Sequence, residues 1–105
     1  MRVIKTSGNG IVNHETIFHF RQKDQVVSSN YSGGKILEGT LIGLLDNNVL
    51  HFTYCQLLVD GEMNHGESKC VVSKDPMTGK IRMEEKFEMR TGASVSVGTN
   101  VFMEL

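Results

Sequence analysis

A single carboxylate interrupts an apolar series in the second half of the chain. Glu85 alternates with Met83 and Phe87, so the three side chains fall on one face of an extended strand. A carboxylate removed from water needs a hydrogen-bond partner, or its pKa rises. Two roles are open to Glu85. The more common one is a structural hydrogen-bond partner for a nearby Tyr, Ser or Arg side chain, or a residue near the mouth of a barrel. The functional one is a polar anchor, or an acid or base, at the floor of a pocket.

Four more polar side chains belong to the same predicted site. They are Tyr31, Tyr54, Gln56 and Ser68, each on an expected strand that also carries apolar residues. Small-ligand pockets are mostly apolar and hold a few convergent donors and acceptors, which hydroxyl and amide groups provide. With Glu85, these residues form our predicted ligand-binding set. The alternative is that the two tyrosines close the core and place their hydroxyls at its rim.

No spacing in the chain is typical of a metal site or of a catalytic nucleophile. The nearest approach to a ligand pair is His65 with Glu67, and this pair alone does not predict zinc binding. No serine or cysteine lies in a nucleophile elbow. We therefore predict no catalytic residue, no metal and no cofactor. A small enzyme that uses Glu85 is the least favoured of three functional classes.

The two cysteines are predicted to be free thiols. Cys55 and Cys70 fall in neighbouring expected strands around the Asp60-Gly61 turn. If that turn is a two-residue hairpin loop, Cys55 lies opposite Gly66 and Cys70 lies opposite His51. A disulfide would then need a shift of the strands by about 13 Å. We expect two reduced and mostly buried side chains.

The rest of the chain alternates apolar and polar residues and is divided by short turn sequences. Glutamate, lysine and methionine favour helices, so a helix is the alternative at 80–90, but the regular alternation there favours a strand. The expected strands cover 1–6, 15–22, 25–32, 35–45, 49–59, 63–73, 80–90 and 93–105, with Ile11 and Val12 extending the first. This order predicts an all-β, antiparallel up-and-down meander that closes into a barrel of about eight strands.

Gly33-Gly34 forms the most regular of the expected hairpin turns. Glycine accepts the positive φ that such turns need, and a two-residue loop here would place Tyr31 opposite Ile36. The strand at 35–45 has apolar residues on both faces, with Ile36 and Ile42 on the same one. It is either a central strand covered on both sides, or a strand whose outer face contacts another subunit.

Length and charge limit the partners of this protein. A chain of 105 residues forms one domain, 1–105, and is long enough to bury a stable core. Its net charge of −1 and the lack of a basic cluster argue against nucleic acid as a partner. No apolar run is long enough to span a membrane or to act as a secretory signal. We expect no membrane association and a cytoplasmic location.

A set of motifs from about residue 15 to the end of the chain carries a family resemblance. It comprises Tyr31-Ser32-Gly33-Gly34-Lys35-Ile36, Gly39, Leu41-Ile42-Gly43, Tyr54, Gln56, Gly61-Glu62, Gly79-Lys80-Ile81-Arg82 and Glu85. The chain thereby resembles a family of small bacterial avidin-like domains. The resemblance implies an eight-stranded avidin- or lipocalin-like β-barrel. Members of that family carry tryptophan near positions 87 and 89, where this chain has Phe87 and Met89, so no biotin-binding motif is transferred.

Proteins of this family are often labelled N-acetylglutamate synthases. A transferase that uses acetyl-CoA needs a glycine-rich loop opening a helix to hold the pyrophosphate. The sequence has neither, so we do not expect synthase activity. Our leading hypothesis is non-enzymatic binding of a small amphipathic molecule in the barrel. The alternative is a filled barrel that works through its outer face, as a homo-oligomer or an accessory interaction protein.

Overall fold

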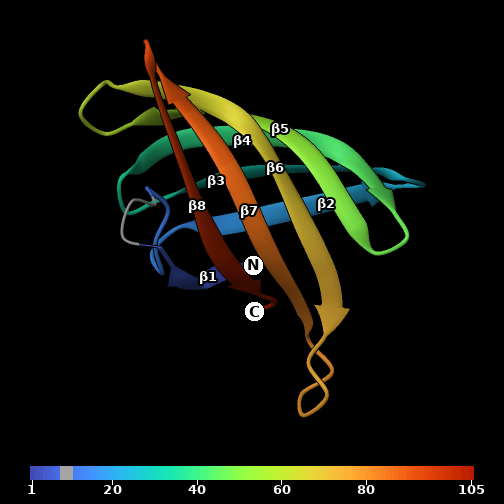
Figure 1. Cartoon of the computed structure of the whole chain (residues 1–105). Helices are drawn as coiled ribbons and strands as arrows, with labels where there is room; N and C mark the ends of the chain where they lie inside the picture. Colours follow the sequence, from blue (N-terminus) through green and yellow to red (C-terminus); the bar gives the residue numbers. More distant parts are fainter. Residues whose placement is uncertain (8–10) are drawn as a thin grey trace.

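The described part of the chain, residues 1–7 and 11–105, folds into eight antiparallel strands that close into a barrel (Figure 1). In this computed structural model the strands are β1 Arg2–Thr6, β2 Ile17–Lys23, β3 Val26–Gly33, β4 Ile36–Asp46, β5 Val49–Leu58, β6 Met63–Lys74, β7 Ile81–Thr91 and β8 Ser94–Met103. Each strand pairs with the next, and β1 pairs with β8 to close the ring. The prediction of an all-β up-and-down barrel is confirmed.

Alternate side chains fill the barrel, because neighbouring residues of a strand point to opposite faces. In β7, Met83, Glu85, Phe87 and Met89 are buried, while the charged residues between them lie outside, as predicted. Further buried residues of the core are Phe18, Tyr31, Leu41, Leu50, Phe52, Tyr54 and Phe102. The interior is therefore mainly apolar and aromatic, and Glu85 is enclosed within it.

The hairpin between β3 and β4 turns one residue later than predicted. Gly34-Lys35 forms the loop and Gly33 pairs with Ile36, so Tyr31 does not lie opposite Ile36. Gly33 has a φ of 113°, and its carbonyl oxygen accepts a 3.0 Å hydrogen bond from Thr16 Oγ1. This contact with the loop before β2 helps to hold Gly33 within the strand pairing, which local turn preferences do not reveal.

A β-bulge in β4 changes which side chains face inward. Pairing with β5 passes from Ile36 to Glu38, which inserts one extra residue into β4. As a result Ile36 and Leu41 both point into the core, whereas Ile42 and Leu44 are exposed. The prediction that Ile36 and Ile42 share a face is wrong for this reason. The apolar residues that remain outside are available for contact with a partner.

The loop between β5 and β6 covers residues 59–62, not only the two residues of the predicted Asp60-Gly61 turn. The glycine has a φ of 91°, but the aspartate is not in the positive-φ region that a two-residue turn of this type needs. The register consequently places Cys55 opposite His65 and Cys70 opposite Leu50. Both thiols are free, as predicted, but Cys55 is exposed and only Cys70 is buried.

Ile11 and Val12 lie in the loop between β1 and β2 and do not extend β1, contrary to prediction. Val12 is buried and packs against the core. It is apolar because it covers part of the barrel interior, although it takes no part in strand pairing. No helix within the described residues is long and apolar enough to cross a membrane.

Candidate functional site

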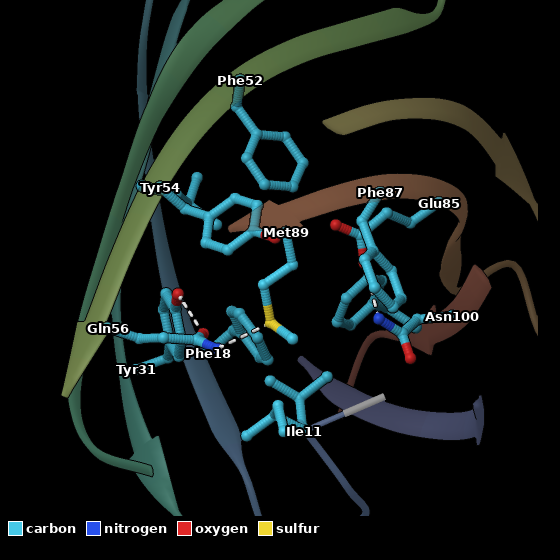
Figure 2. Close-up of a pocket in the computed structure, with 13 residues that line it drawn as sticks. Ile11, Phe18, Tyr31, Phe52, Tyr54, Gln56, Glu85, Phe87, Met89 and Asn100 are labelled. Atoms are coloured by element: carbon cyan, nitrogen blue, oxygen red, sulfur yellow. Dashed lines mark hydrogen bonds between the residues drawn. The ribbon is translucent and has the colours of Figure 1, made fainter. Parts of the chain in front are cut away.

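A small cavity lies inside the barrel and is surrounded by side chains from six strands (Figure 2). Its volume is about 30 Å³. The surrounding residues are Ile11, Val12, Phe18, Tyr31, Leu41, Phe52, Tyr54, Gln56, Glu85, Phe87, Met89, Asn100 and Phe102. Most of this lining is apolar, so the few polar groups determine what the cavity can recognise.

Glu85 forms part of the cavity wall and is only 6% exposed. It stands opposite Asn100 in the pairing of β7 with β8, and Asn100 Nδ2 donates a 2.8 Å hydrogen bond to Glu85 Oε1. Burial raises the pKa of the Glu85 carboxyl, and hydrogen bonding by Ser68 and Asn100 offsets part of that rise. Glu85 is therefore easier to protonate than an exposed glutamate.

Two buried polar atoms beside Glu85 have no hydrogen-bond partner among the described residues. They are Ser68 Oγ and Asn100 Oδ1. The Ser68 hydroxyl lies near enough to lower the pKa of Glu85, but it lacks the geometry of a full hydrogen bond. Leaving such a group unpaired costs about 1–3 kcal/mol, so folded proteins satisfy nearly all of them. These atoms are the part of the site most suited to a ligand's polar group.

Tyr31 and Gln56 are already engaged with each other. Tyr31 OH donates a 2.9 Å hydrogen bond to Gln56 Oε1, and Gln56 Nε2 donates a 2.6 Å bond to Asn64 Oδ1. Asn64 Nδ2 in turn donates to Thr91 Oγ1 at 3.3 Å. This chain of bonds connects β3, β5, β6 and β7 across the barrel. Its members therefore fix the wall of the site, and their polar atoms are less available than those around Glu85.

Tyr54 is also held in place by the fold. Its hydroxyl donates a 3.1 Å hydrogen bond to the Glu88 backbone carbonyl, passing over Gly66 on β6. A Cβ atom at Gly66 would collide with that carbonyl, so glycine makes room for the bond. Burial, with the Glu85 charge as a smaller cause, raises the pKa of both Tyr31 and Tyr54. Both hydroxyls consequently remain protonated donors.

The structure brings most of the predicted site together. Tyr31, Tyr54, Gln56 and Glu85 line the cavity, whereas Ser68 does not line it but is buried close to the Glu85 carboxyl. That these five residues bind a ligand stays a prediction.

Two residues that the sequence analysis does not identify complete the site. Asn100 alternates with Phe102 on β8, so a polar residue at an inward position is the signal that could have revealed it. Met89 reaches toward the opposite wall, and its Sδ lies 3.8 Å from Gln56 Nε2 (Figure 2). The sequence shows Met89 as a core residue but does not show that it fills the cavity.

A wider hollow of about 340 Å³ lies at the end of the barrel where β2, β4 and β6 finish. Its lining includes the apolar side chains of Phe20, Leu45, Leu50, Val72 and Met83. The unpaired buried atoms Ser68 Oγ and Asn100 Oδ1 do not belong to this lining. We place the candidate site at Glu85, because unpaired buried groups are a stronger sign of a ligand than volume alone.

Metal-ligating side chains do not gather in the part of the chain that the structure describes. No group of three or more His, Cys, Asp or Glu residues there could hold a metal ion. His65 is exposed on the outside of β6, away from the cavity.

Comparison with known proteins gives one match. A family model described as avidin-like protein matches residues 1–105, which is the whole chain. No curated protein and no solved structure matches it. The closed ring of eight described strands agrees with the architecture that the resemblance implies. The chain therefore belongs to the avidin-like protein family.

Proposed function

We propose that this avidin-like barrel binds one small amphipathic molecule that carries N–H or O–H donors. The polar group of the molecule lies against Glu85 and Asn100, with Ser68 behind the Glu85 carboxyl, and its apolar part contacts Phe87 and Phe102. One observation carries the proposal: two buried polar atoms next to a buried carboxyl have no partner among the described residues. An eight-stranded barrel is wide enough to hold one such ligand.

The unpaired atoms define the polar group of the ligand. Asn100 Oδ1 can only accept a hydrogen bond, and an ionised Glu85 carboxylate also only accepts. The Ser68 hydroxyl can donate or accept. An amine, an amide or a diol offers two donors and fits this set. A carboxylate or a fully ionised phosphate does not, because it has only acceptors and cannot donate to Asn100 Oδ1.

The ligand must displace part of the Met89 side chain. The cavity of about 30 Å³ has room for roughly two water molecules, since each needs about 10–15 Å³ on this measure. Methionine is unbranched, has several rotatable bonds and fills irregular gaps. Met89 can therefore occupy the site in the absence of ligand and repack when the ligand's apolar part enters.

Native mass spectrometry of the protein purified from its own host tests this proposal. We expect a non-covalent adduct of one small molecule per chain. Asn100→Ala removes both the orphan acceptor and the donor to Glu85, so the fraction of protein that carries the adduct should fall about tenfold or more. Asn30→Ala, which removes an exposed amide on β3, is the matched control and should keep the adduct.

Circular dichroism of each variant shows whether the barrel remains folded. The proposal is contradicted if the folded wild-type protein carries no adduct. It is also contradicted if folded Asn100→Ala and Glu85→Gln variants retain the same adduct to the same extent, because the ligand would then lie elsewhere.

A further inference from the structure

The outer surface of β4 to β8 forms a broad groove of about 920 Å³. Two rows of exposed side chains line it, and each row crosses the five strands through directly paired residues. Row A consists of Ile42, Thr53, Glu67, Glu88 and Val97. Row B consists of Leu44, His51, Lys69, Lys86 and Thr99. Along every strand, the member of row A and the member of row B are two residues apart.

Like charges stand directly opposite each other in these rows. Glu67 is paired with Glu88, and Lys69 is paired with Lys86. Such pairs destabilise a sheet. Glu88 contacts Arg90 through a single carboxylate oxygen at 2.9 Å, but no ion pair forms at Glu67, Lys69 or Lys86 within the described residues. A partner with the opposite order of charges would relieve this repulsion.

We propose that the partner is a second copy of this chain, related by a two-fold axis that runs between the two rows. The axis lies in the interface, perpendicular to the strands, at the level of Ser68 and Phe87. It exchanges the rows, so row A of each copy meets row B of the other. Glu67 then meets Lys69 of the second copy. Each such contact occurs twice.

The remaining row positions are also self-complementary under this axis. Glu88 meets Lys86 of the second copy, and Ile42 meets Leu44. Ile42 and Leu44 are 55% and 58% exposed, so their contact removes apolar surface from water at the edge of the charged centre. The face therefore matches itself in charge and in apolar character.

The shape of the barrel suits the same axis. A barrel of twisted strands is a hyperboloid, concave along its axis and convex around it. Strands in such barrels tilt by roughly 35–45° from the barrel axis. A two-fold axis perpendicular to the strands therefore places the two barrel axes at roughly 70–90° to each other, which is twice the tilt. At that angle the concave profile along one barrel lies over the convex circumference of the other, so the two surfaces fit together. The proposal does not depend on ligand binding, because the rows point away from the cavity.

Charge reversal tests the proposal by sedimentation equilibrium of the full chain. We expect wild-type protein to form a dimer that weakens as the salt concentration rises. Glu67→Lys places two lysine side chains together across the interface, and Lys69→Glu places two glutamates together. Each single variant should raise the dimer dissociation constant about tenfold or more. Glu67→Lys also turns the Glu67–Glu88 repulsion into an attraction, so it should fold at least as well as the wild type.

Mixing the two single variants gives the decisive result. In a mixed dimer, every position 67 meets a position 69 of opposite charge, so the mixture should dimerise when neither variant does alone. The double variant E67K/K69E should also dimerise. Glu38→Lys and Lys35→Glu change the net charge equally outside the rows and should leave wild-type dimerisation unchanged.

Three results would overturn the proposal. One is a wild-type chain that stays monomeric at the highest soluble concentration. The second is a dimer that Glu67→Lys and Lys69→Glu leave intact. The third is a pair of monomeric variants that remain monomeric when mixed, which would show that these positions do not meet across a two-fold axis.

Discussion

Asn100 lies directly opposite Glu85 in the β7–β8 pair, and only one of the two polar amide atoms of Asn100 is hydrogen-bonded. Nδ2 donates a 2.8 Å hydrogen bond to Glu85 Oε1, whereas Oδ1 is buried without a partner among the described residues. One side chain thus stabilises the ionised form of the buried carboxyl and also presents an unsatisfied acceptor. The proposed function assigns Glu85 a role in recognition on the basis of this relationship, in addition to its place in the core.

Asn100→Ala should destabilise the protein by about 1–3 kcal/mol, because the buried Glu85 carboxyl loses a hydrogen-bond partner and stays out of water. Urea denaturation near neutral pH measures this loss. Asn30→Ala, at an exposed position of β3, is the control; it removes only a solvent-exposed hydrogen bond from Arg21 and should change the free energy of unfolding by about 1 kcal/mol or less. If the two substitutions lower the free energy of unfolding equally, the Glu85–Asn100 hydrogen bond contributes no more to stability than an exposed one.

Glu85→Gln should remove a pH dependence of stability. Burial raises the pKa of Glu85 in the folded state, so the folded protein binds this proton more tightly than the unfolded chain. The stability that this proton provides is complete below the ordinary glutamate pKa and is lost as the pH rises through the folded pKa.

The free energy of unfolding of the wild type, relative to Glu85→Gln, should therefore fall as the pH increases through that window. Urea denaturation at a series of pH values measures this difference. Glu84→Gln, on the exposed face of β7, is the control for removing a carboxylate. A difference between wild type and Glu85→Gln that stays constant with pH would contradict the expectation.

Met89→Ala should lower stability and enlarge the cavity. Truncation of a buried methionine costs about 2–5 kcal/mol, and Met89 is 8% exposed. Met77→Ala, at a position that is 93% exposed, should cost less than about 0.5 kcal/mol. If Met89 fills the ligand site, the folded Met89→Ala protein should also retain more of the native adduct in mass spectrometry. A lower retention would mean that Met89 belongs to the bound site and is not displaced.

Gly66→Ala should destabilise the barrel by about 1–3 kcal/mol, since a Cβ atom there collides with the Glu88 carbonyl that Tyr54 binds. Thermal unfolding gives the measurement. Ser73→Ala, an exposed substitution on the same strand, provides the reference. Rescue of Gly66→Ala by Tyr54→Phe would not be expected, because the collision is with backbone and not only with the hydroxyl.

The two thiols should differ sharply in reactivity. Cys55 is exposed, whereas Cys70 is buried and burial raises the pKa of its thiol. A thiol reagent should modify one cysteine rapidly in the folded protein and the second only after unfolding. Cys55→Ser should abolish the rapid phase. Two rapid phases, or a rapid phase that survives Cys55→Ser, would contradict the observed strand register.

The sequence by itself determined the architecture, because short-range preferences suffice for it. The regular alternation in β7 and the Asn47-Asn48 turn are both local signals, and the structure gives these two asparagines φ values of 50° and 63°. Glu85 was recognisable as a buried carboxyl from the same alternation. These features depend on residues that are close in the chain.

Only the tertiary structure decided how the strands align and what the barrel encloses. The bulge after Ile36 and the loop at 59–62 each shift a register, and alternation cannot detect either shift. Asn100 meets Glu85 through the pairing of two strands, and Met89 reduces the cavity to about 30 Å³ by packing across it. Register and cavity volume depend on contacts between residues far apart in the sequence, where a displacement of one residue moves every side chain to the opposite face.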